Sequence, residues 1–392
     1  MKAQYDVIVV GAGPGGAVCA ERLAARGASV LLVDKKHAGW HKPCGGGIPE
    51  AVFGKYGVPT GLGFANPRVR VVDRHRRASV TPLRYRDVYR NAFDEHLADR
   101  ARRAGADVEF DAPVRDMRRV GDAFVVRTAR GTSRANYLVG ADGVNSAVRR
   151  QLFGEPLRDD QCAVALEYWY RVRHRRSSLD FFIEPGVLDT GYAYVFPKDD
   201  GVLAIGLSGV DIASPRSVLD RLVALPRYRA LVGDAPIDAV HGGRIPYRHL
   251  SRLREGRLLL VGDAAGLNTP IVFAGIPVAL QSGRLAGDLI ARSLATRSDA
   301  PLEHYTVDTL RAASPGFAAC HAYYDLLLAG RRPPAFTALA RRFLTRPHLL
   351  PRIYRIWRAL GRLVDGLDLD RLTAPRGVAG DARGSTTDSN HR

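Results

Sequence analysis

The sequence predicts an α/β fold made of two lobes and a helical C-terminus, with the second lobe inserted into the first. Three observations predict it. Near the N-terminus an apolar strand, a glycine-rich turn and a helix follow one another within residues 5–26. Between residues 160 and 209 the pattern changes to β segments rich in aromatic and β-branched residues. At residues 257–296 a strand, a glycine turn and a helix return, so we expect the first lobe to be discontinuous.

The first of these segments has the order of a βαβ unit. Residues 5–10 (YDVIVV) are uniformly apolar after Asp6, which is typical of a strand buried on both faces. Residues 15–26 follow as a helix that ends at Gly27, a residue common at helix C-termini. Residues 29–34 (SVLLVD) then form the second strand of the unit.

The turn of this unit reads G-x-G-x-x-G at Gly11, Gly13 and Gly16, and Asp34 ends the second strand. Gly11 permits the tight turn, Gly13 lets the backbone approach a pyrophosphate, and Gly16 lets the helix pack close to the sheet. The helix N-terminus offers free N–H groups to phosphates, and Asp34 is placed to bind ribose hydroxyls. The combination predicts a Rossmann-type dinucleotide-binding lobe. We also place Lys35 at the cofactor, but not as a sign of a 2′-phosphate, which Asp34 would repel.

The remaining segments divide between the lobes. Further elements predicted for the first lobe are a helix over residues 88–104, strands over 107–110, 123–128 and 136–143, and, after the insertion, a strand and turn over 257–266 and a helix over 275–296. Strands of the second lobe are predicted at residues 163–172, 178–184, 191–197 and 201–209. The predicted boundaries are 1–155 for the first part of the cofactor lobe, 156–250 for the antiparallel-sheet substrate lobe, 251–300 for the second part of the cofactor lobe, 301–372 for a helical, basic and amphipathic region, and 373–392 for a disordered tail.

The composition is that of a globular protein with an excess of arginine. The 392 residues carry a formal net charge of +18, and only six of the 58 basic residues are lysine. This excess reflects either the base composition of the coding DNA or an anionic partner, and both interpretations stay open. The four cysteines form no C-x-x-C pair, so we expect a reducing compartment and no disulfide framework. No run of 18 apolar residues is present, and we expect a cytoplasmic protein without a metal site.

One C-terminal segment concentrates the positive charge. Residues 326–364 contain nine arginines and no acidic residue. Apolar residues on one face of a helix here are Leu349, Ile353, Ile356, Trp357, Leu360 and Val364. Such a helix either lies in a membrane interface or packs on its own protein with a solvated arginine face. The first interpretation predicts a peripheral protein at the inner face of the membrane.

Two further motifs identify the dinucleotide. Asp142-Gly143 and Gly262-Asp263 each follow a predicted strand and precede small residues. Together with the N-terminal glycines, they resemble the FAD-binding pattern of the p-hydroxybenzoate hydroxylase-like flavoproteins. The resemblance implies that FAD is the cofactor, that Asp142 lies in its site and that Asp263 binds the ribityl chain. Arg90, in YRNAFDEHL, matches the arginine of a helix that contacts FAD in that group.

Three stretches narrow the resemblance to one family. The loop of residues 42–50, KPCGGGIPE, is similar to the Lys-Pro-Cys-Gly-Gly-x-Ile-Pro loop of the geranylgeranyl reductase family. Residues 191–209, GYAYVFPKDDGVLAIGLSG, resemble the Tyr-x-Trp-x-Phe-Pro segment of that family. Residues 242–246, GGRIP, also fit its pattern. This family reduces isolated C=C bonds in prenyl chains with FAD. The resemblance therefore implies a prenylated lipid, quinone or pigment as substrate, and NAD(P)H or reduced ferredoxin as electron donor.

The same resemblance implies roles for individual residues. Cys44 and Tyr192 are the candidate proton donors, while Tyr194, where the family often has Trp, and Phe196 line the substrate channel. Further residues placed at the cofactor are Cys44, Gly45, Gly46, Gly275 and Ile276. A packing role stays open for Cys44 and Tyr192, and a surface role for Arg90. One departure concerns Phe273-Ala274-Gly275-Ile276, which stands where the family often has Gly-Glu-Gly-Ile.

Other functions compete with this prediction. An FAD-dependent monooxygenase acting on an aromatic or polyketide substrate has the same cofactor lobe. A non-catalytic isoprenoid-binding protein is the third hypothesis, and it predicts that the purified protein lacks FAD. Nucleic-acid binding is motivated by charge alone, since no recognised module is present. We therefore expect no nucleic-acid partner, and the sequence leaves the oligomeric state open.

Overall fold

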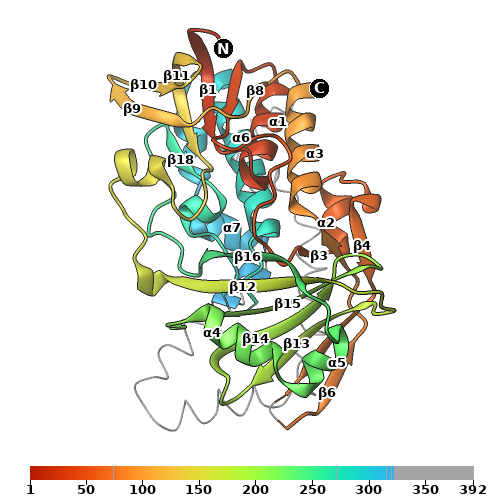
Figure 1. Cartoon of the computed structure of the whole chain (residues 1–392). Helices are drawn as coiled ribbons and strands as arrows, with labels where there is room; N and C mark the ends of the chain where they lie inside the picture. The colour runs from red at the N-terminus through yellow and green to blue at the C-terminus, as the bar shows by residue number, and fades with distance from the viewer. Residues whose placement is uncertain (74, 271, 315, 319, 322–392) are drawn as a thin grey trace, which may run out of the picture.

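The computed structural model describes residues 1–321 apart from 74, 271, 315 and 319 (Figure 1). An upper lobe contains an eight-stranded, largely parallel sheet, and a lower lobe contains a seven-stranded sheet. The predicted C-terminal region 301–372 lies mostly outside the described residues, and the predicted tail lies entirely outside them.

The centre of the upper sheet is built from apolar strands. In order across the sheet they are β17 (Arg254–Glu255), β18 (Leu258–Leu260), β11 (Gly131–Gly140), β1 (Gln4–Val10), β2 (Val30–Val33) and β8 (Asp107–Glu109), with the hairpin of β9 (Val114–Val120) and β10 (Ala123–Thr128) joined to β11. β1 pairs in parallel with β11 and β2, which places Val9 beside Val139 and Leu32. β18 pairs in parallel with β11. A segment late in the sequence therefore completes a sheet that β1 begins.

Two helices of the upper lobe meet through glycines. α1 (Pro14–Ala24) packs against α6 (Ile276–Thr296). A Cβ added to Gly283 would lie 2.0 Å from the Gly15 carbonyl oxygen, and one added to Gly287 would lie 2.9 Å from the Cys19 carbonyl oxygen. Because side chains at these positions would separate the helices, glycine is required for this contact.

The lower sheet supplies a broad aromatic face. Its strands, in order, are β16 (Ile237–Pro246), β12 (Cys162–Arg171), β15 (Val202–Gly209), β14 (Leu188–Pro197), β13 (Ser178–Glu184), β5 (Arg68–Val72) and β6 (Ala78–Thr81). All neighbours are antiparallel except β13 and β5. Alternation along the strands puts Tyr168 and Ile205 in the core cluster with α4 (Pro215–Val223) and α5 (Pro226–Val232), and Glu167, Tyr194 and Phe196 on the opposite face.

A small third sheet lies at the junction of the lobes (Figure 1). It consists of β3 (Gly47–Pro49), β7 (Tyr85–Val88) and β4 (Gly63–Asn66), and the helices beside it are α2 (Glu50–Lys55) and α3 (Arg90–Arg103). β7 leads directly into α3, so the start of that helix lies beside β3 and the loop that precedes it. α7 (Val307–Ala313) is the last element described.

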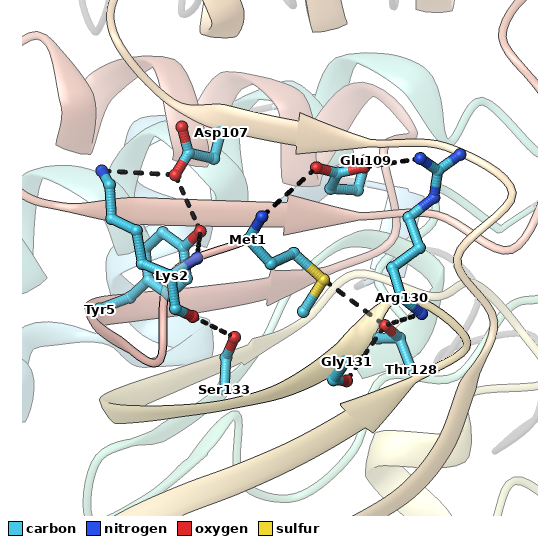
Figure 2. Close-up of polar contacts among 9 residues, drawn as sticks. All are labelled: Met1, Lys2, Tyr5, Asp107, Glu109, Thr128, Arg130, Gly131 and Ser133. Atoms are coloured by element: carbon cyan, nitrogen blue, oxygen red, sulfur yellow. Dashed lines mark hydrogen bonds and ion pairs between the residues drawn. The ribbon is translucent and has the colours of Figure 1, made fainter.

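The first residues are tied to the edge of the upper sheet (Figure 2). The hydroxyl of Tyr5 donates to Asp107 on β8 (2.8 Å), and the Lys2 ammonium pairs with the same carboxylate (3.3 Å). The Ser133 hydroxyl donates to the carbonyl of Lys2 (2.7 Å). Burial raises the pKa of Tyr5 to about 12, so its hydroxyl stays protonated as a donor. These contacts connect β1 to strands on both of its sides.

The predicted α/β fold, with a cofactor lobe interrupted by a sheet lobe, is confirmed. β5 and β6 precede residue 156 and yet belong to the lower sheet, so residues 156–250 contribute five of its seven strands. The domain boundaries stay a prediction. Within the part of the chain that the structure describes, no helix combines the length and apolar character needed to cross a membrane.

Candidate functional site

The glycine turn after β1 has the geometry of a dinucleotide cradle. Gly11 has a φ of +108°, and a Cβ there would lie 2.3 Å from the Ala141 carbonyl oxygen. A Cβ on Gly16 would lie 1.9 Å from the carbonyl oxygen of Gly11, so Gly16 is required for packing within the turn. A Cβ on Gly13, in contrast, would meet nothing within 4 Å. Gly13 therefore faces the open side, where a pyrophosphate can approach the backbone.

The groups around this turn also fit a dinucleotide. Asp34 accepts hydrogen bonds from the backbone N–H groups of Ala12 (2.7 Å) and Lys36 (2.8 Å), which fix its carboxylate beside the turn. α1 begins without a side-chain cap, so its first N–H groups are available to phosphates. Lys35 is exposed. The Lys36 ammonium lies over the ring of Trp40, 4.4 Å from its centroid.

Asp142 organises its own turn. Its carboxylate accepts from the Ser146 hydroxyl (2.5 Å) and from the backbone N–H groups of Ala147 (2.6 Å) and Val148 (3.2 Å). Asp142 caps the backbone of the segment that follows it, and these hydrogen bonds order the loop that lies behind Gly11. The structure thus gives Asp142 a structural role, and its contact with the cofactor stays a prediction.

Asp263 lies where α6 begins. It accepts from Lys42 in an ion pair of 3.1 Å that joins the loop before β3 to the upper lobe. A Cβ on Gly275 would lie 2.5 Å from the Asn268 amide nitrogen and 3.3 Å from Asp263. α6 starts at the next residue, Ile276, without a side-chain cap. The structure therefore brings three predicted residues together, and adds Lys42, which the sequence motif contained but we did not single out.

Arg90 links α3 to the cysteine loop. Its guanidinium is 2% exposed and binds the Asp94 carboxylate through two hydrogen bonds of 2.9 and 2.6 Å. The side chain of Cys44 lies close enough to influence this guanidinium electrostatically. Burial lowers the pKa of Arg90, but the Asp94 carboxylate more than offsets it, so the net pKa is raised and the charge is retained. Arg90 is thus a buried cation beside Cys44 and not a surface arginine.

The glycines after Cys44 pack against the protein itself. A Cβ on Gly45 would lie 3.1 Å from the Phe196 ring, and one on Gly47 would lie 2.9 Å from the Leu179 side chain. We expected these glycines because the loop approaches a cofactor closely. The structure shows another close approach, to the aromatic face of the lower sheet. Cys44 is half-buried and packs against the apolar cluster formed by α1, α2, α3 and α6.

Tyr194 and Glu167 form a buried pair on the aromatic face. The Tyr194 hydroxyl donates to Glu167 Oε2 (2.8 Å), while the Trp169 indole N–H donates to Glu167 Oε1 (2.9 Å). Burial, and then the charge of Glu167, raise the pKa of Tyr194 well above its ordinary value. Phe196 packs beside Tyr194 with a ring-centroid distance of 4.6 Å. The two predicted substrate-wall residues therefore lie side by side, and Tyr194 is held in one orientation.

Tyr192 connects the lower sheet to the loop before α6. Its hydroxyl donates to the carbonyl of Val272 (2.9 Å), and its ring stacks on Phe273 with a centroid distance of 6.0 Å. Phe273 has a φ of +50°, a left-handed conformation that is costly for a phenylalanine. Burial raises the pKa of Tyr192, so the hydroxyl keeps its proton.

An aromatic cluster lies next to this face. The rings of His41 and His241 are 4.7 Å apart, and Trp169 lies 5.0 Å from His41 and 4.4 Å from His241. Burial, followed by the influence of His241 and Lys198, lowers the pKa of His41 to about 4. Burial also lowers the pKa of His241. Both imidazoles are therefore neutral near pH 7.

The comparisons with known proteins agree with this geometry. Residues 4–163 match the family model described as FAD binding domain. A digeranylgeranylglycerophospholipid reductase of Methanocella arvoryzae is 30% identical over 327 residues, which cover 75% of this chain and 79% of that protein. The chain belongs to the geranylgeranyl reductase family. A second relative, digeranylgeranylglycerophospholipid reductase 3 of Methanosphaera stadtmanae, is 28% identical over 77% of this chain and 81% of its own length.

Solved structures share the fold of this geranylgeranyl reductase family member. A geranylgeranyl bacteriochlorophyll reductase-like protein of Thermoplasma acidophilum has a TM-score of 0.68 and 22% identity, covering 94% of this chain and 90% of that chain. The p-nitrophenol 4-monooxygenase of Pseudomonas putida has a TM-score of 0.70 and 18% identity, covering 94% and 100%. At these identities the likeness concerns the fold alone. The resemblance to the family and the FAD-binding lobe predicted from the sequence are both confirmed.

Proposed function

We propose that this protein is an FAD-dependent reductase that saturates isolated C=C bonds of a prenyl chain. The observation that supports this most directly is the position of Cys44. It lies beside the buried Arg90 and packs against the FAD-binding lobe, while Gly45 next to it lies against the aromatic face of the lower sheet. A thiol at this junction lies between the cofactor lobe and a wall suited to an apolar chain.

Saturation of one bond adds a hydride to one carbon and a proton to the other. FAD, once reduced, supplies the hydride when bound. Cys44 holds the proton at Sγ, beside the buried guanidinium of Arg90. Tyr192 is the second candidate donor, although its hydroxyl is directed at the Val272 carbonyl. NAD(P)H or reduced ferredoxin provides the two electrons for each turnover.

Two observations support a prenylated lipid as the substrate: the aromatic residues of the lower sheet and the names of the related proteins. Tyr194 and Phe196 belong to a buried aromatic cluster of the lower sheet, an apolar surrounding that suits a chain of isoprene units. The curated relatives carry names of digeranylgeranylglycerophospholipid reductases, which favours a prenylated lipid over a quinone or pigment. A lipid is reached from a membrane surface, and the nine arginines of residues 326–364 suit an anionic inner face. We therefore propose a cytoplasmic protein that docks peripherally.

Mass spectrometry of prenyl lipids, quinones and pigments tests the function. Cells that express the protein should accumulate species heavier by two mass units per reduced bond, and cells with the Cys44→Ala variant should not. Rapid substrate-triggered oxygen uptake with a hydroxylated product would instead establish the monooxygenase. Purified protein without flavin absorbance would establish a non-catalytic carrier.

A further inference from the structure

Lys198 is a fully buried lysine for which the proposed chemistry has no use. It follows the Phe-Pro pair at the end of β14, and both its side chain and that of Asp87 have 0% exposure. Its ammonium donates to Asp87 Oδ1 (2.6 Å), to the carbonyl oxygen of Gly45 (2.6 Å) and to that of Val88 (3.4 Å). The lysine thus joins the lower sheet to β7 and to the loop that carries Cys44.

The ammonium keeps its charge in this position. Burial lowers the pKa of Lys198, but the carboxylates of Asp87 and Glu167 more than offset it, so the pKa lies above its ordinary value. A fully desolvated ion pair is a weak source of stability, because the desolvation penalty cancels much of the Coulomb attraction. Apolar residues of similar volume in place of such a pair often give equal or greater stability. A role other than stability explains the pair better.

The cysteine loop is shaped around this ion pair. Gly46 has a φ of +81°, and a Cβ there would lie 2.7 Å from the Lys198 ammonium, 2.7 Å from Asp87 Oδ1 and 2.4 Å from the Val88 carbonyl oxygen. Only a glycine lets the backbone come this close. The bond from Lys198 to the Gly45 carbonyl then sets the peptide plane between Gly45 and Gly46, one residue after Cys44.

We propose that Lys198 is the positioning residue for Cys44. The buried ammonium, paired with Asp87, holds the Gly45 carbonyl and so fixes the position of Cys44 in the loop beside Arg90. A charge-assisted hydrogen bond to a backbone carbonyl is stronger than a neutral one and has a defined direction. The effect on turnover rests on the proposed function, whereas the effect on the Cys44 thiol does not.

Two variants separate positioning from stability. Lys198→Met leaves the Asp87 carboxylate buried without its counter-ion, so this protein should be destabilised. In Lys198→Met/Asp87→Ala both charges are gone, so thermal stability should largely return. Neither variant retains the bond to the Gly45 carbonyl. Lys55→Met, at an exposed lysine of α2, is the matched control.

The first measurement is the rate at which iodoacetamide alkylates Cys44 in the holoenzyme, followed by peptide mass spectrometry. Both Lys198 variants should react about tenfold faster than the wild type, because the loop opens more often. Lys55→Met should react at the wild-type rate, and buried Cys19 serves as the internal reference. An unchanged Cys44 rate in the double variant overturns the proposal.

The second measurement is the reduction of a prenyl lipid. The double variant should keep its flavin absorbance and a near-normal KM while kcat falls at least about tenfold. If the double variant recovers kcat together with thermal stability, Lys198 serves stability alone and the proposal is overturned. If the wild type reduces no prenyl chain while Cys44 alkylation still accelerates in both variants, the proposed function fails and the positioning role stands.

Discussion

The hydroxyl of Tyr194 reaches the carboxylate of Glu167 across an entire intervening strand. Tyr194 on β14 and Glu167 on β12 both lie opposite Gly206 of β15 in the sheet register. A side chain at Gly206 would occupy the space of the tyrosine, since a Cβ there would lie 2.3 Å from Tyr194 Cζ. The hydrogen bond of 2.8 Å therefore depends on the absence of a side chain in the strand between. Glu167, in turn, fixes the orientation of the Tyr194 ring.

Gly206→Ala should displace the Tyr194 ring and cost about 1–3 kcal/mol of unfolding free energy, as overpacking of a core usually does. Chemical denaturation measures this loss. Gly243→Ala, on the edge strand β16, is the control, because its Cβ would meet nothing within 4 Å. Equal stability of the two variants would show that Tyr194 is not confined by Gly206.

Gly13→Ala tests the cofactor cradle without disturbing the protein. The new methyl group meets no protein atom within 4 Å, so the melting temperature of the apoprotein should be unchanged within experimental error. FAD should bind at least about tenfold more weakly, because the methyl group stands where the pyrophosphate approaches. Gly54→Ala in α2, also in open space, should leave FAD affinity intact. Flavin fluorescence titration distinguishes the two.

Cys44→Ala should retain bound FAD and lose prenyl reduction by roughly 100-fold or more, which is the usual contribution of a general acid. The mechanism assigns the thiol a proton and no part in folding. Cys162→Ala removes a thiol from β12, away from the loop, and should leave the rate unchanged. A Cys44→Ala enzyme with full activity would transfer the proton-donor role to Tyr192.

Stability should fall on acidification because His41 is held neutral. Its pKa is about 4 in the folded protein against 6.5 unfolded. Between these values the unfolded chain binds the proton and the folded protein does not, so unfolding free energy rises with pH across this window. The contribution is fully present above pH 6.5 and is lost below pH 4. The difference between the two pKa values corresponds to about 3.4 kcal/mol, which solvent screening of the half-buried ring reduces. His41→Asn should remove this part of the pH dependence, while the exposed His37→Asn should not.

The arginines near the C-terminus should set membrane affinity. Replacement of Arg352, Arg355 and Arg362 by Gln in the full chain should weaken binding to anionic vesicles by about 1 kcal/mol per residue. Binding to neutral vesicles should change little, and high salt should reduce the difference. Cosedimentation measures both. An equal loss on both vesicle types contradicts electrostatic docking.

Patterns within single segments of the sequence predicted the elements whose structure does not depend on distant segments. The turn with Gly11 and Gly16, the strands β1 and β2 and the long helix α6 follow from periodicity and glycine spacing. β16 and the β5–β6 hairpin were not predicted. β16 is largely exposed and contains Gly242 and Gly243, so it lacks the apolar alternation of a strand. β5 joins the sheet only through β13, more than a hundred residues later in the chain.

The site shows the same division. The resemblance of the motifs predicted that Cys44, Asp263 and Gly275 lie at one site, and the structure places them near the junction of the lobes. Asp87, Lys198 and Glu167 were missed because their partners are distant in sequence, and a charged residue inside a strand gives no sign of what it contacts. Lys198 does directly follow a strand of buried residues, which was the available signal. A lysine is almost never fully buried without a partner, so the ion pair would follow once the burial of Lys198 is known.

The glycine contact between α1 and α6 has a consequence for the order in which the protein matures. On the ribosome, α1 is synthesised with the first strands, but the helix that covers it and the strand β18 that flanks β11 emerge only after the whole lower sheet. Until then the nascent βαβ unit keeps an apolar helix face uncovered and the end of one edge of β11, residues 138–140, unpaired. Both features favour association with chaperones or other chains. We expect folding of the FAD-binding lobe to be completed last, although its sequence is translated first, and truncations before residue 296 to aggregate.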